Sequence, residues 1–349
     1  MNIELLSSPL ESQYTSFVER SSDASIYHTL EWRDVLLDSY GFAHRCLIAV
    51  EGGAVCGALP VFEVKSLLRG CRGISMPFSH LTPVLANNVK TMDSLLMAAR
   101  DLASERKMSY IELRHGVPLD KPFCQDFCNY NISRLDLKKE SIDDVWKSFK
   151  TAIRNQTRKA EKNGVEIKVA ESSDEYRTFY DLEAETRKFQ GMPIYPLSLF
   201  LNIYEKLHKA GKSRLELAYY NGKPIAGAMA FFSNKKAIYA YGSSKKDREY
   251  MQLCPNNILV WDLIKYSYNA GCEVFDFGST FIQNEGLLHF KKQWGTETVP
   301  LYYSILSERT SPPVFNRSGF KVGLVKKLLR YCPMPLFKAV GPFLIKESC

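Results

Sequence analysis

An internal repeat is the feature that most restricts how this chain can fold. The segment LIAVEGGAVCGALPVF (Leu47–Phe62) returns as LAYYNGKPIAGAMAFF (Leu217–Phe232), with leucine, glycine, alanine and phenylalanine at equivalent places. Each copy predicts a strand, a tight turn and a second strand, because Gly-Gly or Asn-Gly between two apolar runs is a strong hairpin signal. A hairpin of this kind occurring twice predicts a duplicated domain.

The similarity continues downstream of both hairpins. In each copy a helical pattern is followed by an apolar strand, Tyr110–His115 in the first and Val274–Ser279 in the second. Both strands carry an acid at the third position, Glu112 and Asp276. The repeated order of hairpin, helix and acid-bearing strand predicts an α/β fold with mixed sheets, built as two related domains.

The two copies divide the 349 residues into three predicted parts. We place a first domain at residues 1–160, ending in a basic connecting helix, a second at 161–307, and a basic amphipathic tail at 308–349. A hydrophobic content of 45% provides for a sizeable core. No apolar run is long enough to span a bilayer, and the first residues lack a signal-peptide pattern. We therefore expect a cytoplasmic protein.

Several classes of site are excluded by missing motifs. The nine cysteines and six histidines show no metal-ligand spacing, so we expect no metal site and no disulfide framework. The sequence Asp-Phe-Gly at 276–278 is also found in kinases, but the chain has no G-x-G and no His-Arg-Asp. No cysteine or serine nucleophile has a histidine partner in a recognisable motif, which is consistent with direct transfer chemistry.

The net charge is +8, and basic residues concentrate in the segment Asp143–Asn163 and in the C-terminal tail. The segment Asp143–Asn163 predicts one helix, with a capping box at Ser141 and Asp144 and with Gly164 ending it. Its basic residues recur every three or four positions and predict one basic stripe: Lys147, Lys150, Arg154, Arg158 and Lys162. A solvated face would explain it, but scarce acids favour an anionic ligand such as a nucleotide, coenzyme A or RNA.

Five stretches together resemble the Fem family, the FemAB-like transferases, in order and spacing. They are IRNQTRKAEKNGVEI (Ile153–Ile167), GKPIAGAMAFF, YAYGSS (Tyr239–Ser244), PNNILVWDLIKYSYNAGCEVFDFG (Pro255–Gly278) and LLHFKKQWGTE (Leu287–Glu297). The resemblance extends to about residue 307 and is strongest after residue 150. It is closest to BioF2-like relatives associated with exopolysaccharide and exosortase loci. The family fold that it implies is a tandem pair of GNAT-type acyltransferase domains.

The resemblance implies transfer of an acyl or aminoacyl group from an activated ester or thioester. The implied acceptor is an amine or hydroxyl of a cell-envelope sugar or peptidoglycan precursor. Two alternatives are an aminoacyl-tRNA-dependent peptidoglycan-bridge transferase and a non-catalytic GNAT scaffold that binds RNA or membrane. No tightly bound cofactor is implied; acyl-CoA, acyl carrier protein and aminoacyl-tRNA are the candidate donors.

The family's Phe-Lys motif falls on Phe290 and Lys291. The resemblance therefore makes Lys291 the first catalytic candidate, stabilising an oxyanion or a donor phosphate, with Phe290 beside the substrates. Lys292 is expected to be a solvated bystander. Asp276 is the second catalytic candidate: it can take a proton, orient a donor or only cap the turn that follows the strand.

Further residues match positions that bind substrates in the family. Tyr241, Ser243 and Asn256 fall at a strand end and a helix start, where GNAT domains hold their donor with main-chain N–H groups. Arg154 and Arg158 match the basic connection and are expected to bind the anionic donor, such as tRNA, or the anionic envelope precursor.

The tail contains a second basic segment, Gly319–Arg330, with the sequence GFKVGLVKKLLR. Its apolar and basic residues fall on different faces of a helix that Pro333 and Pro335 would end. Such a helix either packs on the body of the protein or lies on anionic lipid. We favour the lipid surface and expect a peripheral contact with the inner face of the cytoplasmic membrane.

Overall fold

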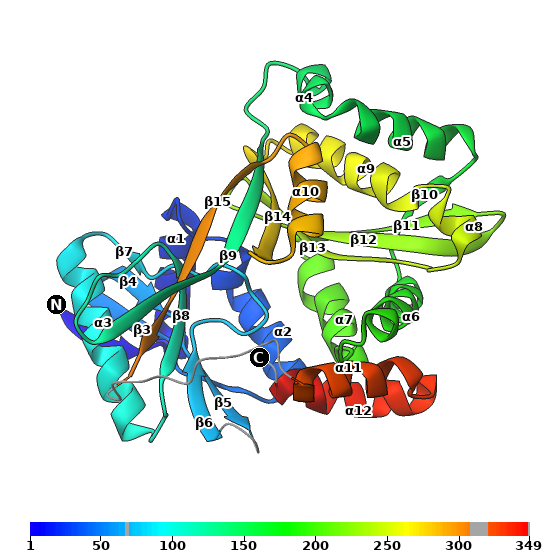
Figure 1. The fold of residues 1–349 in the computed structure, drawn as a ribbon. Coiled ribbons are helices and arrows are strands. Elements are labelled where there is room, and N and C mark those ends of the chain that lie inside the picture. The colour runs from blue at the N-terminus through cyan, green and yellow to red at the C-terminus, as the bar shows by residue number, and fades with distance from the viewer. Residues whose placement is uncertain (67–69, 308–319, 348–349) are drawn as a thin grey trace. The chain divides into compact units, whose positions relative to one another are not determined.

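The computed structural model describes residues 1–66, 70–307 and 320–347, with the side chains of 320–322 excepted (Figure 1). The chain forms two compact units. Unit 1 contains Met1–Tyr130 with the described parts of Pro300–Phe315 and Lys346–Cys349. Unit 2 contains Asn131–Val299 and the described part of Asn316–Ile345.

Unit 1 is a mixed α/β assembly with two sets of paired strands. Its strands follow the orders β1-β3-β4-β7 and β15-β8-β6-β5-β2. The elements are β1 (Asn2–Leu5), α1 (Glu11–Arg20), α2 (Leu30–Tyr40), β2 (Ala43–His44), β3 (Leu47–Glu51), β4 (Ala54–Leu59), β5 (Phe62–Ser66), β6 (Gly70–Ile74), β7 (Leu85–Ala86), α3 (Val89–Glu105) and β8 (Ile111–Gly116), with 3₁₀ turns at Ser8–Leu10 and Ile26–His28. The strands β9 (Cys124–Asp136) and β15 (Glu297–Leu306) have residues in both units.

Unit 2 carries its strands in the order β10-β11-β12-β13-β14, with β9 next to β14. Its elements are α4 (Ile142–Ser148), α5 (Thr151–Lys162), β10 (Glu166–Val169), α6 (Ser173–Gln190), α7 (Leu197–Ile203), a π-helical turn (Tyr204–His208), β11 (Ser213–Tyr220), β12 (Lys223–Ser233), β13 (Lys236–Ser244), α8 (Arg248–Met251), α9 (Pro255–Asn269), β14 (Val274–Phe281), α10 (Glu285–Gln293), α11 (Phe320–Tyr331) and α12 (Met334–Glu347).

The structure confirms the predicted mixed α/β fold and its repeat. Both predicted hairpins form, β3 with β4 and β11 with β12. In each unit a helix then joins two parallel strands, β6 to β8 through α3 and β13 to β14 through α9. The parallel ladder ends at Glu112 in unit 1 and at Asp276 in unit 2. The acid that recurs in the sequence therefore has the same structural position twice: it is where two parallel strands part.

The single helix predicted for Asp143–Asn163 is wrong. The predicted cap is present, since the Ser141 hydroxyl accepts a hydrogen bond from the Asp144 N–H (3.2 Å), but α4 ends at Ser148. Phe149 and Lys150 are extended, with ψ near 147° and 148°, and α5 begins at Thr151. Tertiary packing overrides helix propensity here, because the extended backbone places the Phe149 ring in the core.

The broken helix also bears on the organisation of the chain. Helix α5 packs on α9 and belongs to unit 2, whereas the repeat places this segment at the end of the first predicted domain. The division at residues 160 and 307 remains a prediction based on the repeat. Residues 308–319 of the predicted tail lie outside the described residues.

The C-terminal helices α11 and α12 are part of unit 2 up to Ile345. The predicted helix over Gly319–Arg330 corresponds closely to α11. Within the described residues, no helix is long and apolar enough to cross a membrane.

Candidate functional site

A polar elbow lies inside β14, where this strand parts from β13, and is built by a carboxylate and a glycine. Asp276 is buried, and its Oδ1 accepts a hydrogen bond from the Gly278 N–H at 2.7 Å. Gly278 has φ +72°, a left-handed conformation that costs a residue with a β-carbon energy. The Arg134 Nε lies 3.3 Å from the Asp276 Oδ2. Asp276 thus fixes the path of the chain where β14 leaves its parallel partner.

Lys291 lies on α10, directly behind this elbow. Its amine donates hydrogen bonds to the main-chain carbonyls of Gly278 (2.8 Å) and Ser279 (3.3 Å), and only 5% of the side chain is exposed. Burial lowers the pKa of Lys291 to about 8, and the nearby Asp276 charge opposes that shift. The neighbouring Lys292 is exposed. The structure therefore holds one amine of the lysine pair inside and leaves the other in solvent, while the roles predicted for the two lysines remain predictions.

Aromatic side chains hold α10 against β14. The buried Trp294 ring lies 6.0 Å from the Phe277 ring and 6.3 Å from the Phe290 ring. The Thr296 hydroxyl donates to the Lys291 carbonyl at 3.0 Å. Phe290 of the predicted Phe-Lys motif thus packs against the core, where it fixes the position of the lysine that follows it.

Strand β13 is irregular where it diverges from β14. Its ladder with β12 shifts register next to Met229, which leaves Ala240 as an extra residue. A β-carbon at Gly242 would collide with the Tyr239 hydroxyl, so a larger residue here would displace the Tyr239 ring. The predicted Tyr241 is buried, with its ring 5.3 Å from that of Phe200.

The predicted Ser243 is part of a buried polar cluster. Its hydroxyl donates to the Oε2 of Glu183, a buried acid on α6. The other oxygen of Glu183 accepts from the Arg187 Nε at 2.6 Å. The Arg187 guanidinium in turn lies 3.9 Å from the centre of the Tyr195 ring. Both carboxylate oxygens are thus paired, which makes burial of this charge tolerable.

A second polar cluster connects the end of β13 to the start of α9. The Ser244 hydroxyl accepts hydrogen bonds from the Asn256 amide (3.3 Å) and the Lys246 amine (3.1 Å). Burial lowers the pKa of Lys246, against the opposing charge of Glu183. Asn256, the predicted residue here, lies in the first turn of α9. The structure therefore brings Ser243 and Asn256 together at the end of β13, and Asp276 and Lys291 together where β14 parts from β13.

The two predicted arginines of α5 have different surroundings. Arg154 donates to the Lys147 carbonyl (3.0 Å) and to the Thr151 hydroxyl (3.3 Å), and so bridges the break between α4 and α5. Arg158 is exposed, with its guanidinium 5.5 Å from the Trp146 ring. The predicted stripe is also less regular than expected, because Lys147 lies on α4 and pairs with Asp144 at 3.3 Å.

Sequence reasoning missed four charged residues of this region: Arg134, Glu183, Arg187 and Lys246. Glu183 and Arg187 are four residues apart on one helix, a spacing that could have indicated a pair. Arg134 carried no such signal because its partner, Asp276, is 142 residues away, and Lys246 carried none because it lies in the loop after β13.

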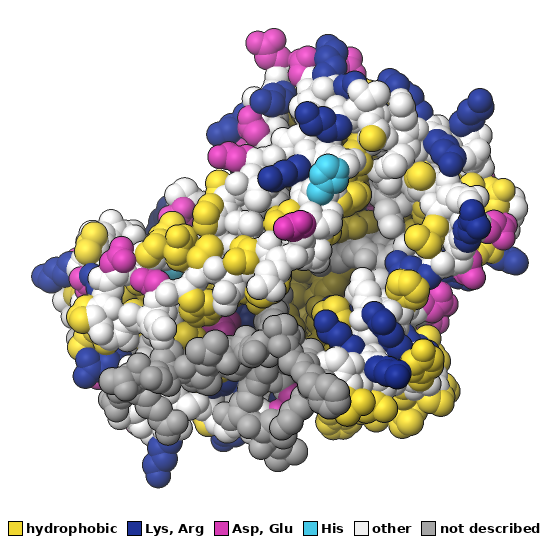
Figure 2. Space-filling view, viewed as in Figure 1, with side chains coloured by type: hydrophobic (Ala, Val, Ile, Leu, Met, Phe, Trp, Pro, Cys, Tyr) yellow, Lys and Arg dark blue, Asp and Glu magenta, His cyan; other side chains and the backbone are white. Residues whose placement is uncertain are grey.

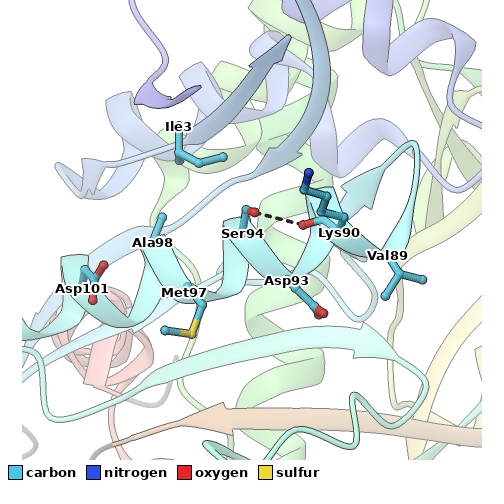
Figure 3. Close-up of a pocket in the computed structure, with 8 residues that line it drawn as sticks. All are labelled: Ile3, Val89, Lys90, Asp93, Ser94, Met97, Ala98 and Asp101. Atoms are coloured by element: carbon cyan, nitrogen blue, oxygen red, sulfur yellow. Dashed lines mark hydrogen bonds between the residues drawn. The ribbon is translucent and has the colours of Figure 1, made fainter. Parts of the chain in front are cut away.

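The surface also has a shallow hollow of about 720 Å³ in unit 1, along α3 (Figure 3). Its lining includes Ile3, Lys90, Asp93 and Met97, and none of the predicted site residues. Within the described residues, no group of three or more histidine, cysteine or acidic side chains could hold a metal ion.

Comparison with known proteins agrees with this geometry. Residues 147–292 match the family model for an acetyltransferase (GNAT) domain, which covers β13, β14 and most of α10. The chain is 20% identical over 377 aligned residues to the Lipid II:glycine glycyltransferase of Staphylococcus epidermidis, covering 81% of this chain and 88% of that protein. Over most of its length the chain is similar to FemAB-like transferases, and residues 147–292 form a GNAT-type domain. As an enzyme it is an acyltransferase or aminoacyltransferase.

Solved structures support the same fold. The crystal structure of FemX aligns with a TM-score of 0.71 at 18% identity, covering 87% of this chain and 97% of that one. The structure of L-PGS from Bacillus licheniformis aligns with a TM-score of 0.56 at 12% identity, covering 92% and 97%. The predicted pair of GNAT-type domains is therefore confirmed at the level of the fold.

Proposed function

We propose that the protein transfers an aminoacyl group from an aminoacyl-tRNA to an amine of a peptidoglycan precursor. The observation that carries this proposal is the buried Lys291 amine, held by two carbonyls at the point where β13 and β14 part. The similarity to a glycyltransferase that acts on lipid II supports an amino acid as the transferred group. Of the three donors that the family resemblance leaves open, aminoacyl-tRNA fits this group better than acyl-CoA or acyl carrier protein, because it carries an amino acid as an activated ester.

The proposed reaction requires little covalent participation by the protein. The acceptor amine attacks the carbonyl carbon of the aminoacyl ester, a C–N bond forms and the C–O bond to the tRNA ribose breaks. The amine proton leaves with the ribose hydroxyl, so the reaction is balanced without a cofactor. The enzyme must hold the two substrates at attack distance and stabilise the negative oxygen of the intermediate.

Lys291 is our candidate for that stabilisation. An ammonium group has three N–H donors, and two of them are oriented by Gly278 and Ser279. The third donor can serve a developing oxyanion or a phosphate. A pKa of about 8 leaves the amine mostly charged at neutral pH, as this role requires.

We assign Asp276 a positioning role. One of its oxygens accepts from the Gly278 N–H and the other lies near Arg134, so it orients the elbow whose carbonyls hold Lys291. Tyr241 shapes the opposite strand end through its packing in the core, and Phe290 places Lys291.

For the donor, we propose the strand end of β13 and the first turn of α9. Ser243 and Asn256 order this region through Glu183 and Ser244. The basic residues Arg158 and Lys246 would face the negative charge of tRNA, while Arg154 keeps α5 in position. An acceptor of the lipid II type would place the enzyme at the inner face of the cytoplasmic membrane.

A donor screen with a matched pair of variants tests the proposal. The purified protein is incubated with a peptidoglycan precursor and, separately, aminoacyl-tRNA, acyl-CoA or acyl carrier protein, and the product is identified by mass spectrometry. We expect product only with aminoacyl-tRNA, and a loss of about 100-fold or more in Lys291→Met but not in Lys292→Met.

Three results would contradict it. Transfer from acyl-CoA or acyl carrier protein alone would assign a different donor, and an exopolysaccharide sugar then becomes the acceptor to test. A normal rate in folded Lys291→Met would remove the assigned role of Lys291. RNA or vesicle binding without transfer from any donor would indicate a non-catalytic scaffold.

A further inference from the structure

Helix α12 has two apolar stripes, and only one of them is buried. Phe337, Gly341 and Ile345 recur at intervals of four and lie inside the protein. Gly341 is packed so closely on Ile194 that a β-carbon there would lie 2.4 Å from a side-chain carbon of Ile194. A helix docked on a protein through one stripe ordinarily has polar residues on the other.

The second stripe of α12 is apolar and faces solvent. It consists of Leu336, Val340 and Phe343, spaced by four and three residues, and Phe343 is 73% exposed. Three large apolar side chains in one row of a helix are unlike the scattered exposed residues that a monomer tolerates.

Helix α11 repeats this arrangement and adds charge. Leu324, Leu328 and Tyr331 are all exposed and share one row, with Leu328 at 63% and Tyr331 at 78%. Lys327 and Arg330 form the adjacent row and are also exposed. The sequence of α11 contains no acid, so these positive charges are not neutralised within the helix.

Both helices are held firmly in unit 2. The Lys188 amine on α6 donates to the Arg330 carbonyl at 2.6 Å, and Lys338 pairs with Asp181 at 2.6 Å. Gly191, at the end of α6, packs on the backbone of Lys326. The exposed rows are therefore displayed by an ordered support. Figure 2 shows hydrophobic side chains along the lower and outer edge of the region where Figure 1 draws α11 and α12, with basic side chains above them.

We infer that these exposed rows form a docking surface for a membrane that contains anionic lipid. We name it the C-terminal face, and it consists of Leu324, Leu328, Tyr331, Leu336, Val340 and Phe343 with the flanking Lys327 and Arg330. This inference stands independently of the proposed transfer reaction. It concerns binding, and its test measures no catalysis.

Charge and chemistry favour lipid over a protein partner. Large apolar side chains beside lysine and arginine match the boundary between acyl chains and anionic headgroups, as in interfacial amphipathic helices. The inferred contact is peripheral, because it is made by the exposed rows of two helices that pack on unit 2. Because Leu329, Phe337 and Ile345 are buried, the helices pack on the body of the protein and present their other face to the lipid.

Point variants test this surface better than deletion, since removal of α11 and α12 would expose the buried stripe. The full chain is sedimented with vesicles of phosphatidylcholine, with or without phosphatidylglycerol. We expect binding only to the anionic vesicles. Leu328→Asp and Phe343→Asp should each weaken it by about tenfold. Lys327→Gln and Arg330→Gln should each weaken it by about fivefold.

Two control variants match these changes elsewhere on the surface. Val89→Asp alters a side chain on α3 that is 64% exposed, close to the value for Leu328. Lys223→Gln removes one positive charge from an exposed position at the start of β12. Both should bind vesicles like the wild type, and circular dichroism confirms that every variant is folded.

A fluorescent reporter provides a second measurement. Tyr331→Trp adds an exposed tryptophan to the C-terminal face, whereas Trp32 and Trp294 are fully buried. Its emission should shift to the blue on anionic vesicles and be quenched by brominated acyl chains.

Three results would overturn the inference. Wild-type protein that stays in the supernatant with anionic vesicles refutes it directly. Unchanged binding of Leu328→Asp with Phe343→Asp would place the contact elsewhere. A dimer that dissociates on Leu328→Asp, without vesicle binding, would make the C-terminal face a contact between two copies of the chain.

Discussion

Replacing Lys291 by methionine should change how the stability of unit 2 depends on pH. Burial lowers the pKa of this amine from 10.5 to about 8 in the folded protein. Below about pH 8 the amine is charged in both states, and keeping the charge buried costs about 3 kcal/mol of unfolding free energy. Between about pH 8 and 10.5 the unfolded chain binds more protons than the folded one, so stability rises with pH and the cost disappears.

The size of the effect follows from these two pKa values. From about pH 7 to about pH 10, the wild type should gain about 2.5 kcal/mol relative to Lys291→Met, which has no amine to titrate. At pH 7 the variant should lie within about 2 kcal/mol of the wild type. The variant no longer has to bury a charge, which stabilises it. This gain is offset because the carbonyls of Gly278 and Ser279 lose their hydrogen-bond donor.

Urea unfolding monitored by tryptophan fluorescence measures this difference. Three of the four tryptophans, Trp146, Trp261 and Trp294, lie in unit 2 with Lys291, so the signal reports mainly that unit. Lys292→Met removes a charge from solvent and should differ from the wild type by the same amount at both pH values. If the difference between Lys291→Met and the wild type is also constant, the amine is not desolvated as described and the argument fails.

Three further predictions concern residues of unit 2. Asp276→Asn should retain the hydrogen bond from the Gly278 N–H and slow transfer by less than about tenfold, whereas Asp276→Ala should slow transfer more. Asp276→Asn should lower the unfolding free energy by less than about 1 kcal/mol, because Arg134 is 42% exposed. Gly191→Ala should cost about 1–3 kcal/mol and expose α11 to limited proteolysis, because the new carbon would lie 2.5 Å from the Lys326 carbonyl oxygen at φ +69°. Burial raises the pKa of Glu216 from 4.5 to about 8. As the pH rises from about 4.5 to about 8, the unfolding free energy of the wild type, measured in urea, should therefore fall relative to that of Glu216→Gln.

The repeat was readable from sequence because it depends on short-range signals. Hairpin turns, helix periodicity and an acid in an apolar strand are local, and all recur in the structure at β3–β4, β11–β12, Glu112 and Asp276. The separation of Lys291 from Lys292 followed from family resemblance and is now seen as burial against exposure. Their roles in transfer remain predictions.

What sequence could not provide are contacts between distant segments. The break at Phe149 and Lys150 arises because an aromatic ring fits between Trp261 and Trp294, more than 100 residues away. Helix propensity alone favours continuing through these residues. The Ser243–Glu183 pair was missed for the same reason, since α6 lies under the end of β13 only after folding.

The break between α4 and α5 also connects the basic helix to the helix of Lys291. The Lys150 N–H, one residue before α5, donates to the Gln293 carbonyl at the end of α10 at 2.9 Å. The Phe149 ring contacts that of Trp294, 5.2 Å away, beside the same bond. An anion bound to Arg158 on α5 would therefore affect α10, which carries Lys291, through one main-chain hydrogen bond and one ring contact. Binding of a ligand to α5 and the position of Lys291 are thus coupled. A ligand bound to α5 should therefore change the rate of amide hydrogen exchange in α10.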